Sequence, residues 1–337
     1  MACVWDIRCF EAGKGNLGLN IKMEVLYMNF ELFTEEMRRL IESGLGKGYQ
    51  VRVKKIVKNN ACPFTGLVIH KRGESMGPIV YMEPYYREYM EGSCLRQLAK
   101  ELVEDYRINE VEQISVNFSS CLLSWDRVKD MILYKVVNTG KNKKMLEEMP
   151  HREYLDLSII YYIYLGNHSA GQFTVPVSTG HMELWKVTEE DLYRAAIKNT
   201  PLLMPAVIKT MEDVLSELIR GEFGEVINDT VVNAMFENIS DSPILYICSN
   251  NVGMNGAACI LYEGVLAEFA ERMGSDVIIL PSSIHETILL PDRDEMDYND
   301  MRDMVKSINE NDVPDEDVLS DRVYRYSLEK REVEVVG

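Results

Sequence analysis

The chain has 337 residues, 46% of them hydrophobic and 27% charged, a composition typical of a soluble globular protein large enough for two domains. Its formal net charge of −18 argues against nucleic acid or an anionic membrane as partner, because both require a basic surface. No apolar run reaches the ~20 residues of a membrane span. Residues 1–22 carry too many charges for a secretory signal.

The N-terminal part predicts a leader followed by an α+β half over residues 28–149. Residues 1–27 are expected to be a disordered leader or an over-extended start, since Met23 and Met28 both suit a true start. Asn29 is then placed to cap a helix whose apolar residues recur at helical spacing as far as Ile41. The segments that follow predict strands at 49–57, 65–70 and 78–82, helices at 84–90, 93–106 and 123–131, a strand at 132–137 and a helix at 141–148.

A second α+β half is expected over residues 150–327, with a tail at 328–337. It begins with a long aromatic strand at 154–165, and Thr188 with Asp191 forms a capping-box pattern at a helix start. Hairpins with inserted helices, rather than regular βαβ repetition, predict an α+β fold with mixed or antiparallel sheets. The remaining elements are predicted as strands at 172–177, 244–248, 257–261, 277–280 and 287–290, helices at 211–219, 262–273 and 301–308, and an edge strand at 323–326.

Charge is distributed unevenly along the chain. Residues 45–73 contain seven bases and no acid, whereas residues 286–337 contain 16 acids and 7 bases. The basic segment is interpreted as a solvated hairpin or as a contact surface for an acidic partner, which includes the chain's own acidic C-terminal part. Nucleic-acid contact through this hairpin is a weaker third interpretation, because the chain as a whole is acidic.

The first candidate site is the polar turn after the strand at 277–280, which contains Ser283, His285 and Glu286. Ser283 and His285 would point to one face of an extended backbone, about 7 Å apart, which could place a hydroxyl near an imidazole. The sequence lacks the G-x-S-x-G elbow that exposes a nucleophilic serine. The alternative is a turn whose serines satisfy backbone groups, and we favour it over catalysis.

The second candidate site precedes and enters the strand at 154–165. His151 and Arg152 could form an anion site with Asp156 as the orienting group, or Asp156 could form a structural ion pair, since an unpaired charge inside a strand is costly. The seven cysteines are scattered, without metal-ligand spacing, which fits a reducing compartment. We therefore expect a cytoplasmic protein with no metal and no other cofactor.

Four stretches of the sequence, taken together and in order, resemble a known bacterial family. The stretches are residues 142–163, 183–201, 256–292 and 319–326, and the similarity extends over roughly residues 28–327. The family is the one described as domain of unknown function 5688, found mainly in low-GC Gram-positive gut anaerobes. The resemblance implies no activity, cofactor or catalytic residue.

Two functions remain open at this stage. The first is a non-enzymatic binding or regulatory protein that recognises a protein or peptide partner, since no segment carries a readable catalytic motif. The second is a hydrolase-like enzyme that uses His285 with Ser283 or Glu286, assisted by His151 and Arg152. Convergence of the two histidines on one open pocket would favour the enzyme, and their separation would favour the binding protein. The sequence leaves the oligomeric state open.

Overall fold

The computed structural model describes residues 27–73, 77–113, 122–168, 171–223, 244–293 and 296–337. The chain forms two compact units. The first lies within residues 1–58 and 63–119 together with 167–171, and the second within residues 59–62, 120–166 and 172–337. Residues 122–149, which the expected halves assign to the N-terminal side, are therefore part of the second unit. The expected leader lies outside the described residues, apart from Tyr27.

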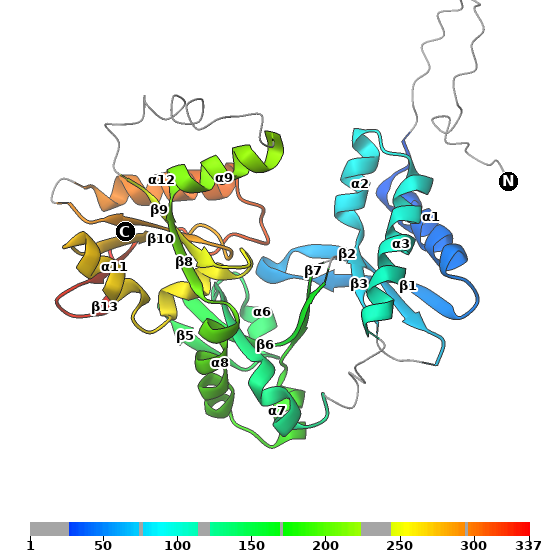
Figure 1. The fold of residues 1–337 in the computed structure, drawn as a ribbon, viewed down its shortest axis with the longest axis horizontal. Coiled ribbons are helices and arrows are strands. Elements are labelled where there is room, and N and C mark those ends of the chain that lie inside the picture. Colours follow the sequence, from blue (N-terminus) through cyan, green and yellow to red (C-terminus); the bar gives the residue numbers. More distant parts are fainter. Residues whose placement is uncertain (1–26, 74–76, 114–121, 169–170, 224–243, 294–295) are drawn as a thin grey trace, which may run out of the picture. The chain divides into compact units, whose positions relative to one another are not determined.

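The first unit is a three-stranded antiparallel sheet with helices packed on one face (Figure 1). Its first helix begins as predicted, because the Asn29 side chain accepts a hydrogen bond from the backbone N–H of Leu32 at 2.9 Å. The strands follow one another in the order β1-β2-β3. The elements are α1 (Phe30–Leu45), β1 (Tyr49–Val57), β2 (Pro63–Lys71), β3 (Ile79–Tyr81), α2 (Met82–Glu91) and α3 (Leu95–Gln113).

The register of β1 and β2 determines which side chains enter the core of this unit. Val51 lies opposite Ile69, and both are buried beneath the helices together with Leu67. The alternate positions, Arg52 and Lys54, therefore point to the other face of the sheet. Side chains of all three helices contribute to the core on the first face: Phe33 and Met37 from α1, Met82 and Tyr89 from α2, and Leu98 and Leu102 from α3.

The second unit contains two sheets that share one large hydrophobic core. The smaller sheet has the order β4-β6-β5, and β7 also pairs with β6. The larger sheet is antiparallel throughout, with the order β13-β12-β10-β11-β9-β8. The strands are β4 (Ile132–Asn138), β5 (His151–Tyr154), β6 (Leu157–His168), β7 (Gly171–Pro176), β8 (Ala206–Thr210), β9 (Tyr246–Asn250), β10 (Val277–Leu280), β11 (Thr287–Pro291), β12 (Tyr324–Ser327) and β13 (Glu332–Val335).

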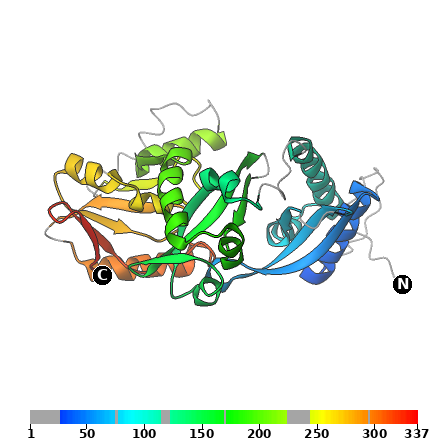
Figure 2. The same cartoon turned by 90° about the horizontal axis from the view of Figure 1, so that it is seen from below.

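Alternation along β10 explains how the larger sheet is covered on both faces. Val277 and Ile279 enter the main core with α11, whereas Ile278 and Leu280 pack with Val305 of α12. Figure 2 shows α11 and α12 on opposite sides of these strands. The helices of this unit are α5 (Trp125–Val128), α6 (Lys143–Leu146), α7 (Thr179–Trp185), α8 (Glu189–Leu203), α9 (Met211–Phe223), α11 (Val265–Met273) and α12 (Tyr298–Asn311).

The capping box predicted for α8 is confirmed. Thr188 Oγ1 accepts the backbone N–H of Asp191 at 3.3 Å, and the Asp191 carboxylate accepts the backbone N–H of Thr188 at 2.8 Å. The α+β class is also confirmed. None of the helices within the described residues is both long and apolar enough to cross a membrane.

The strand predicted over residues 154–165 is confirmed from Leu157 onward, as part of β6, but its first three residues lie outside that strand, because β5 and β6 form a hairpin. Tyr154 pairs with Leu157, and Leu155 adopts a left-handed backbone with φ of 56° that reverses the chain. Asp156 therefore lies in a two-residue turn and not inside a strand. The main-chain oxygen of Asp156 accepts a hydrogen bond from Thr139 N–H at 3.0 Å, which attaches the turn to the end of β4.

The predicted strand at 257–261 is also wrong: Gly256–Leu261 is a 3-10 helix. Asn255 has φ of 55°, and a Cβ atom on Gly256 would lie 2.5 Å from the His285 carbonyl oxygen and 2.7 Å from the Asn250 nitrogen. The chain therefore turns sharply against its neighbours here, and the apolar run is buried as a tight helix. The predicted edge strand is likewise corrected, because β12 lies between β10 and β13 and the edge is β13.

Candidate functional site

The Ser283 hydroxyl and the His285 imidazole do not form a nucleophile–base pair. Ser283 Oγ accepts the backbone N–H of His285 at 3.0 Å, and the Ser283 residue is only 6% exposed. The imidazole instead contacts Asp317 Oδ1 through Nε2 at 3.2 Å and accepts the N–H of Asn255 on Nδ1 at 3.2 Å. The serine therefore satisfies a backbone group, which is the structural alternative considered from the sequence.

The acidic neighbours of His285 control its protonation. The hydrogen bond with Asp317 raises the pKa of His285 above its ordinary value, and the charge of Glu286 acts in the same direction, whereas burial opposes both. Nδ1 accepts the Asn255 N–H only while the ring is neutral, so protonation, which Asp317 favours, exchanges this hydrogen bond for a charged contact with Asp317. An imidazole held in this way links the 281–286 turn to the segment around Asp317.

The three residues of the second candidate site lie in three separate hydrogen-bond networks. His151 Nδ1 lies 2.9 Å from the Met149 carbonyl oxygen. The Asp156 carboxylate accepts hydrogen bonds from Ser320 Oγ at 2.7 Å and Tyr324 Oη at 2.5 Å. Asp156 is therefore bound by two hydroxyl groups, and it does not orient Arg152.

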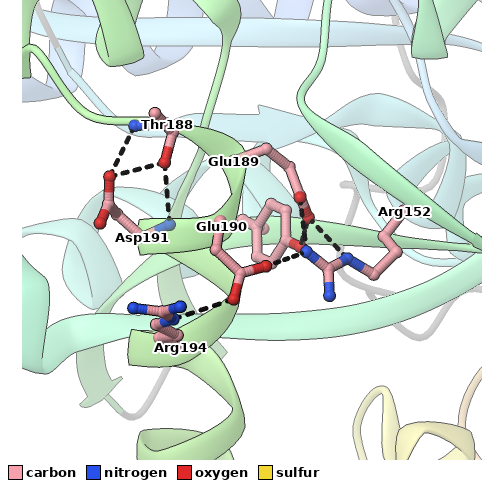
Figure 3. Close-up of polar contacts among 7 residues, drawn as sticks. Arg152, Thr188, Glu189, Glu190, Asp191 and Arg194 are labelled. Carbon is pink, nitrogen blue, oxygen red and sulfur yellow. Dashed lines mark hydrogen bonds and ion pairs between the residues drawn. The ribbon is translucent and has the colours of Figure 1, made fainter.

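Arg152 is the centre of a charged network between β5 and the first turn of α8 (Figure 3). Its Nη2 lies 2.8 Å from Glu189 and 2.6 Å from Glu190, and its Nε donates to Glu189 at 3.2 Å. The guanidinium lies 3.8 Å from the ring centroid of Tyr193. Arg194 binds the second carboxylate oxygen of Glu190 at 2.9 Å, so two cations and two anions neutralise one another.

The pKa values of this network reflect its pairing. Hydrogen bonds to Glu189 and then Glu190 raise the pKa of Arg152, and those from Arg152 and then Arg194 lower the pKa of Glu190. Burial raises the pKa of Tyr161, whose hydroxyl also donates to Glu189. Arg152 therefore remains charged but is already paired with carboxylates, which makes it a poor site for a further anion.

A cavity of about 520 Å³ lies beside this network, entirely within the second unit. Arg152, Glu153, Arg331 and Glu332 line it, so two charges of each sign are present. Arg331 is itself paired, with Glu271 at 2.9 Å. The aromatic part of the lining consists of five tyrosines, four from different elements and one, Tyr262, directly after the 3-10 helix: Tyr134, Tyr154, Tyr193, Tyr262 and Tyr326.

The hydroxyl groups of two of these tyrosines have different environments. Tyr262 Oη donates to the Met204 carbonyl oxygen at 3.1 Å. Tyr134 is 2% exposed, and its hydroxyl has no hydrogen-bond partner among the described residues. Burial raises the pKa of Tyr154 to about 12 and raises the pKa of Tyr134 further. The cavity wall therefore combines aromatic surface with polar and charged groups in about equal measure.

Sequence reasoning missed this cavity except for Arg152. Its tyrosines are far apart in the chain, and each one reads as an ordinary core or strand residue. No local motif could have indicated the site, since only the packing of β4, β5, α8, the segment after Gly256 and β12 brings these side chains together.

Comparison with known proteins places the chain in a family. A model of the family of unknown function DUF5688 matches residues 30–328, which is most of the chain. The chain belongs to this family. No curated protein and no solved structure gives a significant match. Membership in DUF5688 therefore confirms the resemblance seen in the sequence, and the function has to be argued from the geometry of the chain itself.

Proposed function

We propose that this DUF5688 protein is a non-enzymatic binding protein whose second unit takes up an uncharged, largely aromatic small molecule. The observation that carries the proposal is the cavity of about 520 Å³ with five tyrosines in its wall. Ligand pockets usually enclose roughly 300–1,000 Å³ and are mostly apolar with a few placed polar groups. This cavity is within that size range, and its wall combines tyrosine rings with polar and charged groups in about equal measure.

The ligand class follows from the charges around the cavity. Arg152 is paired with Glu189 and Glu190, and Arg331 with Glu271. An anionic ligand would lose hydration without gaining a free counter-ion from these arginines, which is unfavourable. An uncharged ligand with an aromatic body would instead contact tyrosine rings at their faces and edges.

The hydrolase alternative has less support. His285 lacks a nucleophile, since Ser283 Oγ binds a backbone N–H, and His151 binds the Met149 carbonyl oxygen. Neither histidine lines the cavity. A catalytic reading would require both His285 and Ser283 to change partners before any reaction.

A blocking substitution tests the proposal with the uncharged dye N-phenyl-1-naphthylamine, whose fluorescence rises in apolar sites. Ile197 lines the cavity from α8, whereas Leu202 on the same helix is exposed outside it. Ile197→Trp and Ala267→Trp should each weaken dye binding about tenfold or more, because overpacking costs roughly 1–3 kcal/mol. Leu202→Trp should leave dye binding unchanged.

Two results would contradict the proposal. One is dye binding that Ile197→Trp, Ala267→Trp and Leu202→Trp leave at the same strength. The other is an absence of dye binding to the folded full chain. Where the dye binds as expected, native mass spectrometry of protein purified from its own host identifies the natural ligand.

A further inference from the structure

The strand β1 carries an unusual set of exposed side chains on the edge of the sheet in the first unit. The order β1-β2-β3 leaves one side of β1 without a strand neighbour within the described residues. Arg52 and Lys54 are exposed on the face away from the helices, and no acid occurs in any of the three strands. Val53 and Val57 alternate with them and are 42% and 67% exposed.

The basic side chains and the exposed valines of β1 have opposite effects on its pairing with another strand. Lysine and arginine on an edge strand repel a second copy of the same strand, which protects the protein from aggregation. Exposed valines and nine residues of extended backbone favour pairing with another strand. An edge with both features rejects a basic strand and accepts an acidic one.

We propose that β1 binds an acidic polypeptide segment of a partner protein, which adds to the sheet as an extended strand. The segment has carboxylates at alternate positions, which lie beside Arg52 and Lys54, and apolar residues between them, which cover Val53 and Val57. Backbone hydrogen bonds to the free side of β1 supply affinity, and the alternation of charge and apolar groups supplies specificity.

The sheet surface next to β1 extends this binding face. Gly66 lies opposite Lys54, and a Cβ atom on Gly66 would lie 2.5 Å from Ile79 Cγ2 and 2.9 Å from Ile56 Cδ1. The two isoleucines therefore close over the glycine and form an apolar ridge beside the cations. This ridge lies on the face of Arg52 and Lys54, so it contacts the methylene groups of the segment's acidic side chains, whose carboxylates reach the cations.

Contacts of Lys58 favour a peptide over a single-stranded nucleic acid. Its ammonium lies 4.0 Å from the ring centroid of Phe64 and 3.7 Å from that of Tyr81. Base stacking needs open aromatic faces, and this lysine already covers one face of each ring. The net charge of −18 also repels a nucleic acid that contacts the whole chain. A short acidic segment contacts only the basic edge.

The test uses fluorescence anisotropy of the full chain with labelled peptides about eight residues long, close to the length of a strand. The probe alternates Glu and Val, a second peptide has the same composition with its Glu residues clustered, and a third alternates Lys and Val. We expect only the alternating Glu–Val peptide to bind the wild-type chain. The double variant Arg52→Glu/Lys54→Glu should bind that peptide about tenfold or more weakly and should gain binding of the Lys–Val peptide.

A matched variant controls for the change in net charge. Arg87→Glu/Arg96→Glu introduces the same charge change at exposed positions on α2 and α3 of the same unit, and it should behave like the wild type. The gain of Lys–Val binding distinguishes a charge-selective edge from simple loss of folding. Three outcomes overturn the proposal: equal binding of the clustered peptide, unchanged binding by the Arg52→Glu/Lys54→Glu variant, or displacement of the Glu–Val peptide by oligothymidine.

Discussion

At the scale of single residues, a Tyr→Phe substitution at two positions of the cavity wall is expected to change the free energy of unfolding in opposite directions. Tyr134 Oη is buried without a partner among the described residues, whereas Tyr262 Oη donates to the Met204 carbonyl oxygen at 3.1 Å. A buried hydroxyl without a partner destabilises the fold, and a bonded one stabilises it. We therefore expect Tyr134→Phe to raise the free energy of unfolding by about 1 kcal/mol and Tyr262→Phe to lower it by about 1 kcal/mol. Urea denaturation measures both changes, and a loss of stability in Tyr134→Phe would show that its hydroxyl has a partner.

The His285–Asp317 contact predicts a pH-dependent contribution to stability. Asp317 raises the pKa of His285 in the folded state, so the folded state binds the proton more tightly than the unfolded chain. The contribution is complete below the unfolded pKa of about 6.5 and is lost as the pH rises through the higher folded value. The stability difference between wild type and His285→Gln should therefore be larger at pH 5.5 than at pH 8, as measured by urea denaturation. When both proteins also carry Asp317→Asn, the stability difference between them should depend less on pH. An unchanged pH dependence would assign it to a group other than the His285–Asp317 pair.

At the scale of elements, the β5–β6 hairpin contains a residue with an unfavourable backbone conformation. Leu155 is 42% exposed and has φ of 56°, a region that costs a leucine about 1–2 kcal/mol, whereas asparagine adopts it more readily. Leu155→Asn should raise the free energy of unfolding by about 0.5–1 kcal/mol. Leu123, a second exposed leucine that is not left-handed, provides the control, and Leu123→Asn should bring no gain. Equal effects at both sites would contradict the backbone explanation.

The elements also show what the sequence could predict. Helix starts with local signals, such as Asn29 and Thr188, were predictable because a cap needs only neighbouring residues. The apolar run at 257–261 was not, because such a run suits a buried strand or a buried helix equally, and crowding around Gly256 by distant segments decides between them. β8 and β13, of five and four residues, were also missed, whereas the continuous apolar run of β10 was predicted although it too has only four residues. The tyrosine-lined cavity was unpredictable for a related reason, since its side chains meet only through packing of five elements.

At the scale of the whole molecule, the two units have separate hydrophobic cores. Leu67 is fully buried in the first core, and Ile279 is fully buried in the second. Leu67→Ala should destabilise the first unit by about 2–5 kcal/mol and leave dye binding unchanged, because the cavity lies in the second unit. Ile279→Ala should lower the melting temperature of the second unit, which is the melting temperature that bound dye raises. Calorimetry with and without N-phenyl-1-naphthylamine measures the melting temperatures of both units. If the dye no longer raised the melting temperature of the second unit in Leu67→Ala, the cavity would depend on the first core.

The hydrogen bonds of Asp156 have a consequence for the order in which the protein is made. Its partners Ser320 and Tyr324 lie 164 and 168 residues further along the chain. Synthesis adds about 5–20 residues per second, so Asp156 is synthesised roughly 8–33 seconds before Ser320. During that interval the turn can bind Thr139 through its main chain, but the Asp156 carboxylate has neither hydroxyl partner and is solvated by water. All strands of the smaller sheet have been made by residue 176, but the side-chain contacts of its β5–β6 turn are completed only after Ser320 and Tyr324 are translated, so a nascent chain stalled before Ser320 would leave the Asp156 carboxylate exposed to solvent.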